Sequence, residues 1–205
     1  MIRLLAFLAA VSVLTAADAP RLIYSKSFPG SNPPWIEITV EKTGAGQYKD
    51  DPKDDDPLKF QLRETEAAQM FSLAGKLDHF SRRLESGLKV ANMGMKTFRY
   101  EDGGKVSEAK FNYSEDADAR ALTDWFEHIA ETERSLMNLE KAVRFDKLGV
   151  QDAILQIEIL RDQNHLVSPQ QFLPMLDRVA KNEIFLHMAR ERAANLGDWI
   201  RTLPK

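Results

Sequence analysis

The sequence predicts an α+β protein: an antiparallel sheet with helices on one face, followed by a C-terminal helical bundle. Short runs that alternate apolar and polar residues dominate residues 21–113, and turn residues separate them. From Ser114 onward the apolar residues recur at steps of three and four, which is the period of an α-helix. We therefore divide the chain into a signal peptide (residues 1–19), a sheet-rich part (residues 20–113) and a helical part (residues 114–205). The two parts form either one domain or two subdomains hinged near Ser114.

The first residues have the layout of a secretory signal peptide. Arg3 precedes an apolar run from Leu4 to Leu14, and small residues follow it. The run is shorter than the roughly 20 residues that a membrane-crossing helix needs. Cleavage is expected after Ala17 or after Ala19, and we favour Ala17 because Pro20 would directly follow the second cut. These features predict an exported bacterial protein, either periplasmic or secreted.

Composition excludes several classes of chemistry. The 205 residues include no cysteine, which excludes disulfides, thiol nucleophiles, thiolate metal sites and the lipid attachment of a lipoprotein. The net charge is −3, from 28 basic and 31 acidic residues, so no basic surface for nucleic acid is expected. No second apolar span follows the signal, so the mature chain is expected to lack a membrane span.

The strands of the sheet-rich part follow from alternation. In the run from Trp35 to Val40, the aliphatic residues Ile36, Ile38 and Val40 share one side and are expected to face the core. Gly44 and Gly46 are predicted to form the turn into a hairpin partner at residues 47–49. Further strands are predicted at residues 21–28 and 58–62, and a second hairpin at residues 95–113 turns at Gly103-Gly104.

Two helices are predicted to cover the sheet. The first spans residues 64–80 and the second residues 114–143, the latter with an apolar stripe at Leu122, Trp125, Ile129, Leu136, Leu139 and Val143. Each follows a strand that ends in two apolar residues around a carboxamide, namely Phe60-Gln61-Leu62 and Phe111-Asn112-Tyr113. This similarity suggests a duplicated strand-strand-helix unit, although acidic residues are favourable at any helix N-terminus.

The rest of the chain is predicted to be helical, over residues 146–166, 168–182 and 183–203. The second of these segments begins Ser168-Pro169-Gln170-Gln171, the pattern of a capping box with proline at the first helical position.

No motif in the sequence identifies a catalytic or metal site. The acidic run from Asp50 to Asp56 has the ligand type that calcium prefers, but Pro52 and Lys53 interrupt it and it contains no turn glycine. The histidines His79, His128, His165 and His187 are never three or four residues apart, as paired helical metal ligands would be. We therefore predict no catalytic residue, no metal ligand and no cofactor.

The candidate recognition surface is a loop before the clearest strand. Pro33 and Pro34 stiffen the backbone of this loop, and Phe28 and Trp35 flank it. Phe28, Pro33, Pro34 and Trp35 are therefore predicted to form a ligand or partner surface, with simple entry into the sheet as the alternative explanation.

Residues 21–80 resemble exported bacterial domains of unknown function. In these domains a strand leads into a Phe-Gly-x-Cys-Pro-x-Tyr-type loop, a second strand, a glycine turn and a helix that contains phenylalanine; Phe28, Gly30, Pro34 and Trp35 occupy comparable places here. The cysteines of the family are missing near Ser27 and Asn32. The segment VSPQQFLPMLDRVAKNE is likewise similar to uncharacterised exported proteins, and neither resemblance implies an activity.

These observations favour an exported, non-enzymatic interaction or binding protein whose partner is an unknown protein or envelope component. One alternative is an envelope enzyme of hydrolase type with a site built from scattered residues, for example where His79 or His128 meets a carboxylate. Another is a cation-dependent envelope protein that uses Asp50–Asp56.

Overall fold

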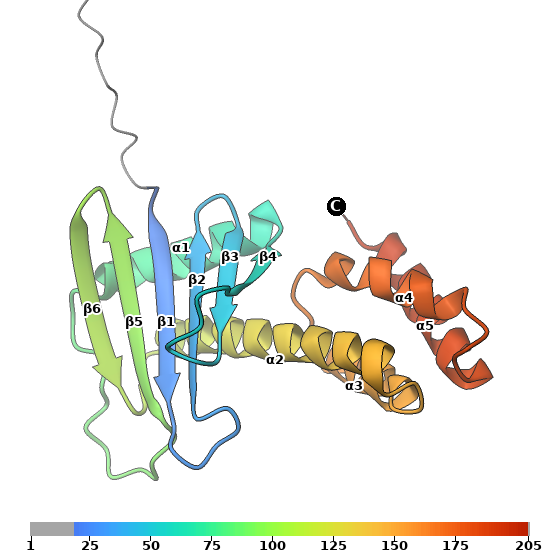
Figure 1. The fold of residues 1–205 in the computed structure, drawn as a ribbon. Coiled ribbons are helices and arrows are strands. Elements are labelled where there is room, and N and C mark those ends of the chain that lie inside the picture. The colour runs from blue at the N-terminus through green and yellow to red at the C-terminus, as the bar shows by residue number, and fades with distance from the viewer. Residues whose placement is uncertain (1–18, 205) are drawn as a thin grey trace, which may run out of the picture.

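The computed structural model describes residues 19–204 and confirms the α+β fold (Figure 1). Six strands form one sheet in which all neighbours are antiparallel. The strands are β1 (Arg21–Ser27), β2 (Trp35–Glu41), β3 (Ala45–Lys49), β4 (Leu58–Gln61), β5 (Met95–Asp102) and β6 (Lys105–Phe111). Their order across the sheet is β4-β3-β2-β1-β5-β6, so β2 and β1 are the two central strands and β4 and β6 are the two edges. The predicted signal peptide lies outside the described residues, except for Ala19.

The alternation of apolar and polar residues along each strand determines which of its two faces is buried. Ile36, Ile38 and Val40 are buried, as predicted, while Trp35 lies half-buried on the other face of the sheet. The β5–β6 hairpin turns at Gly103-Gly104, where both φ angles are positive (52° and 84°) and suit glycine.

Gly46 is not the turn residue that the sequence predicts. It lies within β3, directly opposite Phe60 of β4. A Cβ atom at this position would overlap the Phe60 ring, so glycine is required here because an aromatic ring crosses the strand.

Two helices cover one face of the sheet, and three more form the C-terminal part (Figure 1). The covering helices are α1 (Glu64–Lys76) and α2 (Ala117–Phe145), and the short 3₁₀ helix η1 (Asp78–Phe80) follows α1. The C-terminal part contains α3 (Val150–Asp162), the 3₁₀ helix η2 (Pro169–Phe172), α4 (Leu173–Ala180) and α5 (His187–Thr202). The last helix thus starts at His187, later than the predicted residue 183. None of the helices in the described part of the chain has the combined length and apolar character for crossing a bilayer.

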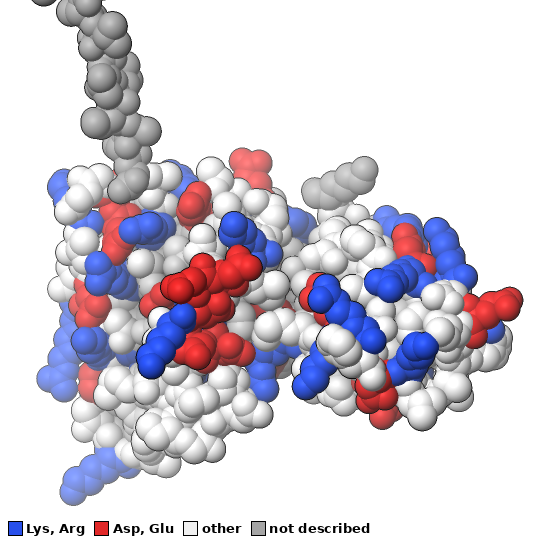
Figure 2. Space-filling view, viewed as in Figure 1, with Lys and Arg blue, Asp and Glu red and all other residues white. Residues whose placement is uncertain are grey.

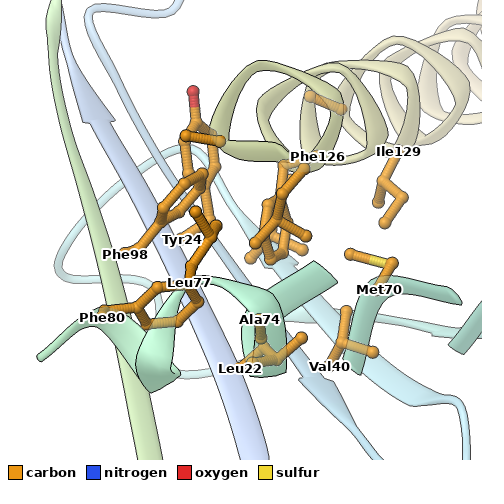
Figure 3. Packing of buried hydrophobic residues seen from close by; sticks show 14 of the residues in the cluster. Leu22, Tyr24, Val40, Met70, Ala74, Leu77, Phe80, Phe98, Phe126 and Ile129 are labelled. Carbon is orange, nitrogen blue, oxygen red and sulfur yellow. The ribbon is translucent and has the colours of Figure 1, made fainter. Parts of the chain in front are cut away.

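Aromatic rings fill the space between the sheet and α2. Phe126 is fully buried and stacks on Tyr24 of β1 with a centroid distance of 4.8 Å, and Phe98 of β5 packs against both rings (Figure 3). The predicted stripe placed Trp125 in the core, but Trp125 is only partly buried and its neighbour Phe126 takes that position.

The long helix α2 belongs to two hydrophobic cores. Its first half, through Ala130, packs in the core under the sheet with α1. Its second half, from Leu136, packs with α3, α4 and α5 in a separate core. The two cores therefore meet within α2, near residues 131–135.

Buried polar residues join the two parts of the molecule at this point. Glu66, Thr132, Glu133 and Ser168 are all buried, and we call them the polar seam. Ser168 Oγ donates to Glu66 Oε2 of α1 (2.6 Å), and Val167 N donates to Thr132 Oγ1 (3.2 Å). Gln171 Nε2 donates to Glu133 Oε1 (2.8 Å).

The predicted capping box at Ser168 and Gln171 is therefore wrong. Ser168 has left-handed backbone angles (φ 46°, ψ 56°), its side chain makes no cap hydrogen bond to the segment that follows, and that segment begins as η2 rather than as an α-helix. Both side chains are used in long-range contacts of the polar seam instead, because their partners on α1 and α2 are brought close only by the fold.

Candidate functional site

A pocket of about 150 Å³ lies between the predicted recognition loop and α2. We call residues 28–34 the proline loop and this cavity the anchor pocket. The loop contributes Phe28, Ser31, Asn32 and Pro33, and the strands add Lys26 and Ile36. The helix contributes four residues at helical spacing, so that they share one face: Glu127, Ala130, Glu131 and Arg134.

Hydrogen bonds within the proline loop fix its shape. Phe28 N donates to Pro34 O (2.8 Å) and Ser31 N donates to Phe28 O (3.0 Å), which closes the loop on itself. Ser31 Oγ lies 2.7 Å from Phe28 O and 2.6 Å from Pro33 O, and its single proton donates to one of them at a time. The loop thus forms a defined wall of the anchor pocket.

Of the four predicted surface residues, the structure brings Phe28 and Pro33 to the anchor pocket. Pro34 is exposed and does not line it. Trp35 begins β2 on the open face of the sheet, away from α2.

Glu127 ties the base of the pocket to β1. Its Oε1 atom accepts from Tyr24 Oη (2.8 Å) and from Lys26 Nζ (2.8 Å). Burial, together with the negative charge of Glu127, raises the pKa of Tyr24 well above its usual value, so Tyr24 remains a neutral donor. Lys26 also lies near the buried Lys96, whose pKa is lowered by burial and by the charge of Lys26.

Two histidines lie next to the pocket. His165 Nδ1 lies 2.9 Å from Glu131 Oε2, and the ring of His128 stacks on that of His165 with centroids 4.0 Å apart. Burial and the neighbouring His165 lower the pKa of His128. A third histidine, His79, does not line the pocket; its ring packs against that of Tyr100, with ring centroids 4.4 Å apart.

Arg134 is the charged residue of the pocket without a counter-ion. It is half-buried, and no hydrogen bond or ion pair connects it to another described residue, whereas Lys26 pairs with Glu127 and Glu131 contacts His165. The guanidinium presents five N–H donors in a fork that matches a carboxylate. The lining of the pocket is therefore mixed, with apolar contacts from Phe28, Pro33, Ile36 and Ala130 beside polar and charged groups, and Arg134 is the cationic donor that has no counter-ion among the described residues.

The arrangement offers little for covalent catalysis. A Glu131–His165 pair has the form of a base with its orienting carboxylate, but no serine, threonine or tyrosine hydroxyl of residues 19–204 bonds to either histidine. The hydroxyl in the pocket, that of Ser31, is engaged with carbonyl groups of its own loop.

The acidic loop of residues 50–57 crosses the open face of the sheet (Figure 1), where Figure 2 shows a cluster of acidic side chains. Asp51 Oδ1 accepts from Lys53 N (2.9 Å) and Asp54 Oδ1 accepts from Asp56 N (3.0 Å). These carboxylates thus stabilise local turns. Among the described residues, no group of three or more His, Asp or Glu side chains is placed to hold a metal ion.

Sequence reasoning missed the helix side of the pocket. The sequence does contain one indication of it. Glu127, Ala130, Glu131 and Arg134 are spaced by three and four residues, so this spacing predicts one helix face that carries three charged residues and a small one. Comparison with protein-family models, with curated proteins and with solved structures finds no match to this chain. The resemblance to exported domains of unknown function therefore stays a prediction.

Proposed function

We propose that the protein is an exported, non-enzymatic interaction module that holds one anchoring group of a partner in the anchor pocket. The observation behind this proposal is the size of the pocket, about 150 Å³. Sites that enclose a whole small-molecule ligand have roughly 300–1,000 Å³. The anchor pocket has room for about five waters of roughly 30 Å³ each, which suits one side chain or chain end. A macromolecular partner supplies such a group while the rest of its surface contacts the rim.

The anchoring group is a carboxylate. Arg134 is the free cationic donor of the pocket, and Phe28, Pro33 and Ala130 supply apolar contacts for a short aliphatic stem. Two carboxylates of the pocket, those of Glu127 and Glu131, would repel a bound carboxylate. Lys26 forms an ion pair with Glu127, and His165 Nδ1 lies within hydrogen-bond distance of Glu131, so both contacts reduce this repulsion.

Replacing Arg134 by glutamine is expected to reduce binding of the carboxylate by about 10- to 100-fold. A hydrogen bond to a charged group contributes roughly 1.5–3 kcal/mol, which corresponds to that range of affinity. The measurement has two arms: NMR titration of the protein with propionate, and quantitative mass spectrometry of partners cross-linked in envelope extract. Propionamide, which lacks the charge, is expected to leave the α2 amide signals unchanged.

The matched control is Arg144→Gln, which removes an exposed arginine from the far end of the same helix. It is expected to behave as the wild type in both arms. Equal binding by the Arg134→Gln and wild-type proteins in both arms would contradict the anchor-pocket function.

The second candidate is an envelope enzyme of hydrolase type, favoured by the contact between Glu131 and His165 beside the pocket. It predicts hydrolysis of ester or amide substrates that is lost in a His165→Ala variant. A blank hydrolase screen of the wild-type protein removes this candidate.

Export is tested by the N-terminus of the mature protein. The strand β1 begins at Arg21 and Lys42 N donates to Pro20 O (3.2 Å), so cleavage after Ala17 preserves every strand of the described residues. We expect intact-mass spectrometry of the native protein from the envelope fraction to give a chain that starts at Asp18. Recovery from the cytosol with Met1 attached would exclude export.

A further inference from the structure

The edge strand β4 borders a second and larger cavity. Its volume is about 640 Å³, within the usual range of ligand sites. Residues 59–63 form one wall, and Ser168, Gln170 and Gln171 of the η2 region form the other. We call it the edge cleft. In Figure 1, β4 lies at the edge of the sheet that is nearest to α4 and α5.

The main chain of β4 directs free hydrogen-bonding groups away from β3. Leu62 N donates to Gly44 O (2.9 Å), so Leu62 points its amide toward the neighbouring hairpin strand. Because alternate residues of a strand point their amides in opposite directions, Lys59 and Gln61 direct their N–H and C=O groups outward. None of these four groups has a partner among residues 19–204.

The cleft also contains side-chain donors that lack an acceptor. Gln170 Nε2 and Arg63 Nε are both buried without a hydrogen bond in the described part of the molecule. A buried donor without a partner costs roughly 1–3 kcal/mol, so an acceptor supplied by a ligand is favourable. Peptide carbonyl groups are acceptors of this kind.

We propose that an extended peptide segment of a partner protein adds as a strand beside β4 in the edge cleft. Main-chain hydrogen bonds to Lys59 and Gln61 bind the segment, and Gln170 or Arg63 donates to its outer carbonyl groups. This site is separate from the anchor pocket, and its residues are not among those that line the pocket.

The two faces of β4 set the side chains that such a segment prefers. Phe60 is buried on the core face, whereas the side chains of Lys59 and Gln61 are exposed on the other face. Side chains of an added strand alternate in the same way. The preferred segment therefore alternates aliphatic residues, which contact Phe60, with acidic residues, which lie near Lys59.

The test uses a peptide of sequence acetyl-Glu-Val-Glu-Val-Glu-amide and the mature protein, starting at Asp18, labelled with ¹⁵N. We expect the amide signals of Lys59 and Gln61 to shift on titration and to become protected from hydrogen exchange. The same peptide with alternate amides N-methylated, so that one edge lacks donors, is expected to bind at least tenfold more weakly.

A pair of variants separates main-chain from side-chain recognition. Lys59→Pro removes the outward N–H at an edge position where proline is tolerated, and Lys59→Ala keeps that N–H. We expect Lys59→Pro to weaken peptide binding at least tenfold and Lys59→Ala to change it by less than threefold. Arg134→Gln, in the anchor pocket, is expected to leave peptide binding unchanged.

Three results would overturn the proposal. The first is equal binding of the plain and N-methylated peptides to the wild-type protein, a result that does not depend on how well the Lys59→Pro variant folds. The second is a set of peptide-induced shifts confined to residues outside the edge cleft. The third is a concentration-dependent shift of Lys59 and Gln61 without peptide, which would show that a second copy of the chain occupies the edge.

Discussion

Replacing Glu133 by glutamine is expected to stabilise the protein above pH 7 by up to about 3.5 kcal/mol. The Glu133 side chain is only 1% exposed, and burial raises its pKa from 4.5 to about 7, although the hydrogen bond from Gln171 partly offsets this. Its second oxygen, Oε2, has no partner among the described residues. A shift of this size corresponds to roughly 1.4 kcal/mol per pH unit over about 2.5 units. A neutral glutamine keeps an acceptor for Gln171 and avoids the cost of a buried charge.

The sign of the pH dependence follows from the raised pKa. Between pH 4.5 and about 7 the folded protein holds a proton on Glu133 that the unfolded chain has lost. Stability therefore falls as pH rises through this window and then levels off. The variant lacks this term, so the difference in unfolding free energy between variant and wild type should grow from about pH 4.5 to about pH 7.

Urea denaturation at several pH values measures this difference. Groups with lowered pKa values, among them Glu85, Glu101 and Asp116, titrate alike in both proteins and cancel in the comparison. The control is Glu140→Gln, a change of the same kind on the same helix outside the polar seam. A difference that does not vary with pH would show that Glu133 carries no raised pKa.

The strands of the sheet could be predicted from the sequence because the patterns that indicate them involve only neighbouring residues. Ile36, Ile38 and Val40 alternate with polar residues, and that alternation alone assigns their face of the strand. The apolar stripe predicted for α2 was correct except at one position. Trp125 and Phe126 are adjacent apolar residues, and the orientation of α2 against the sheet, which the sequence pattern does not give, decides that Phe126 is the buried one.

Contacts over long sequence distances could not be predicted from local rules. Ser168 and Gln171 match a capping box, yet their partners are Glu66 and Glu133 on other helices. The same limit applies to function. The proline loop was recognisable from its composition, whereas Arg134 joins it only through the fold, and the edge position of β4 depends on the order of strands in the sheet.

Replacing Glu66 by alanine is expected to destabilise the protein by about 3 kcal/mol, because it disrupts the polar seam between α1 and the η2 region. Glu66 accepts from Ser168 Oγ (2.6 Å), Arg63 N (2.9 Å) and Arg63 Nη2 (2.6 Å). Alanine removes the acceptor of Ser168 Oγ and Arg63 Nη2, whereas Arg63 N keeps its second acceptor, Ser168 Oγ (3.2 Å). Burial alone would raise the pKa of Glu66, but the hydrogen bonds from Arg63 and Ser168 outweigh it, so the pKa is lowered. The stabilisation is therefore present above the pKa of the unfolded chain and is lost as pH falls through the folded value.

Two changes at Ser168 separate the hydrogen bond from the backbone. Ser168→Ala and Ser168→Gly both remove the hydrogen bond to Glu66, but only glycine adopts a φ angle of 46° without steric strain. We expect Ser168→Gly to be more stable than Ser168→Ala by about 1 kcal/mol. In a double-mutant cycle, Glu66→Ala and Ser168→Ala should couple by about 1 kcal/mol or more, measured by urea denaturation at pH 7. Additive effects would mean that the two side chains do not support each other, and that the two cores are held together by α2 and apolar contacts alone.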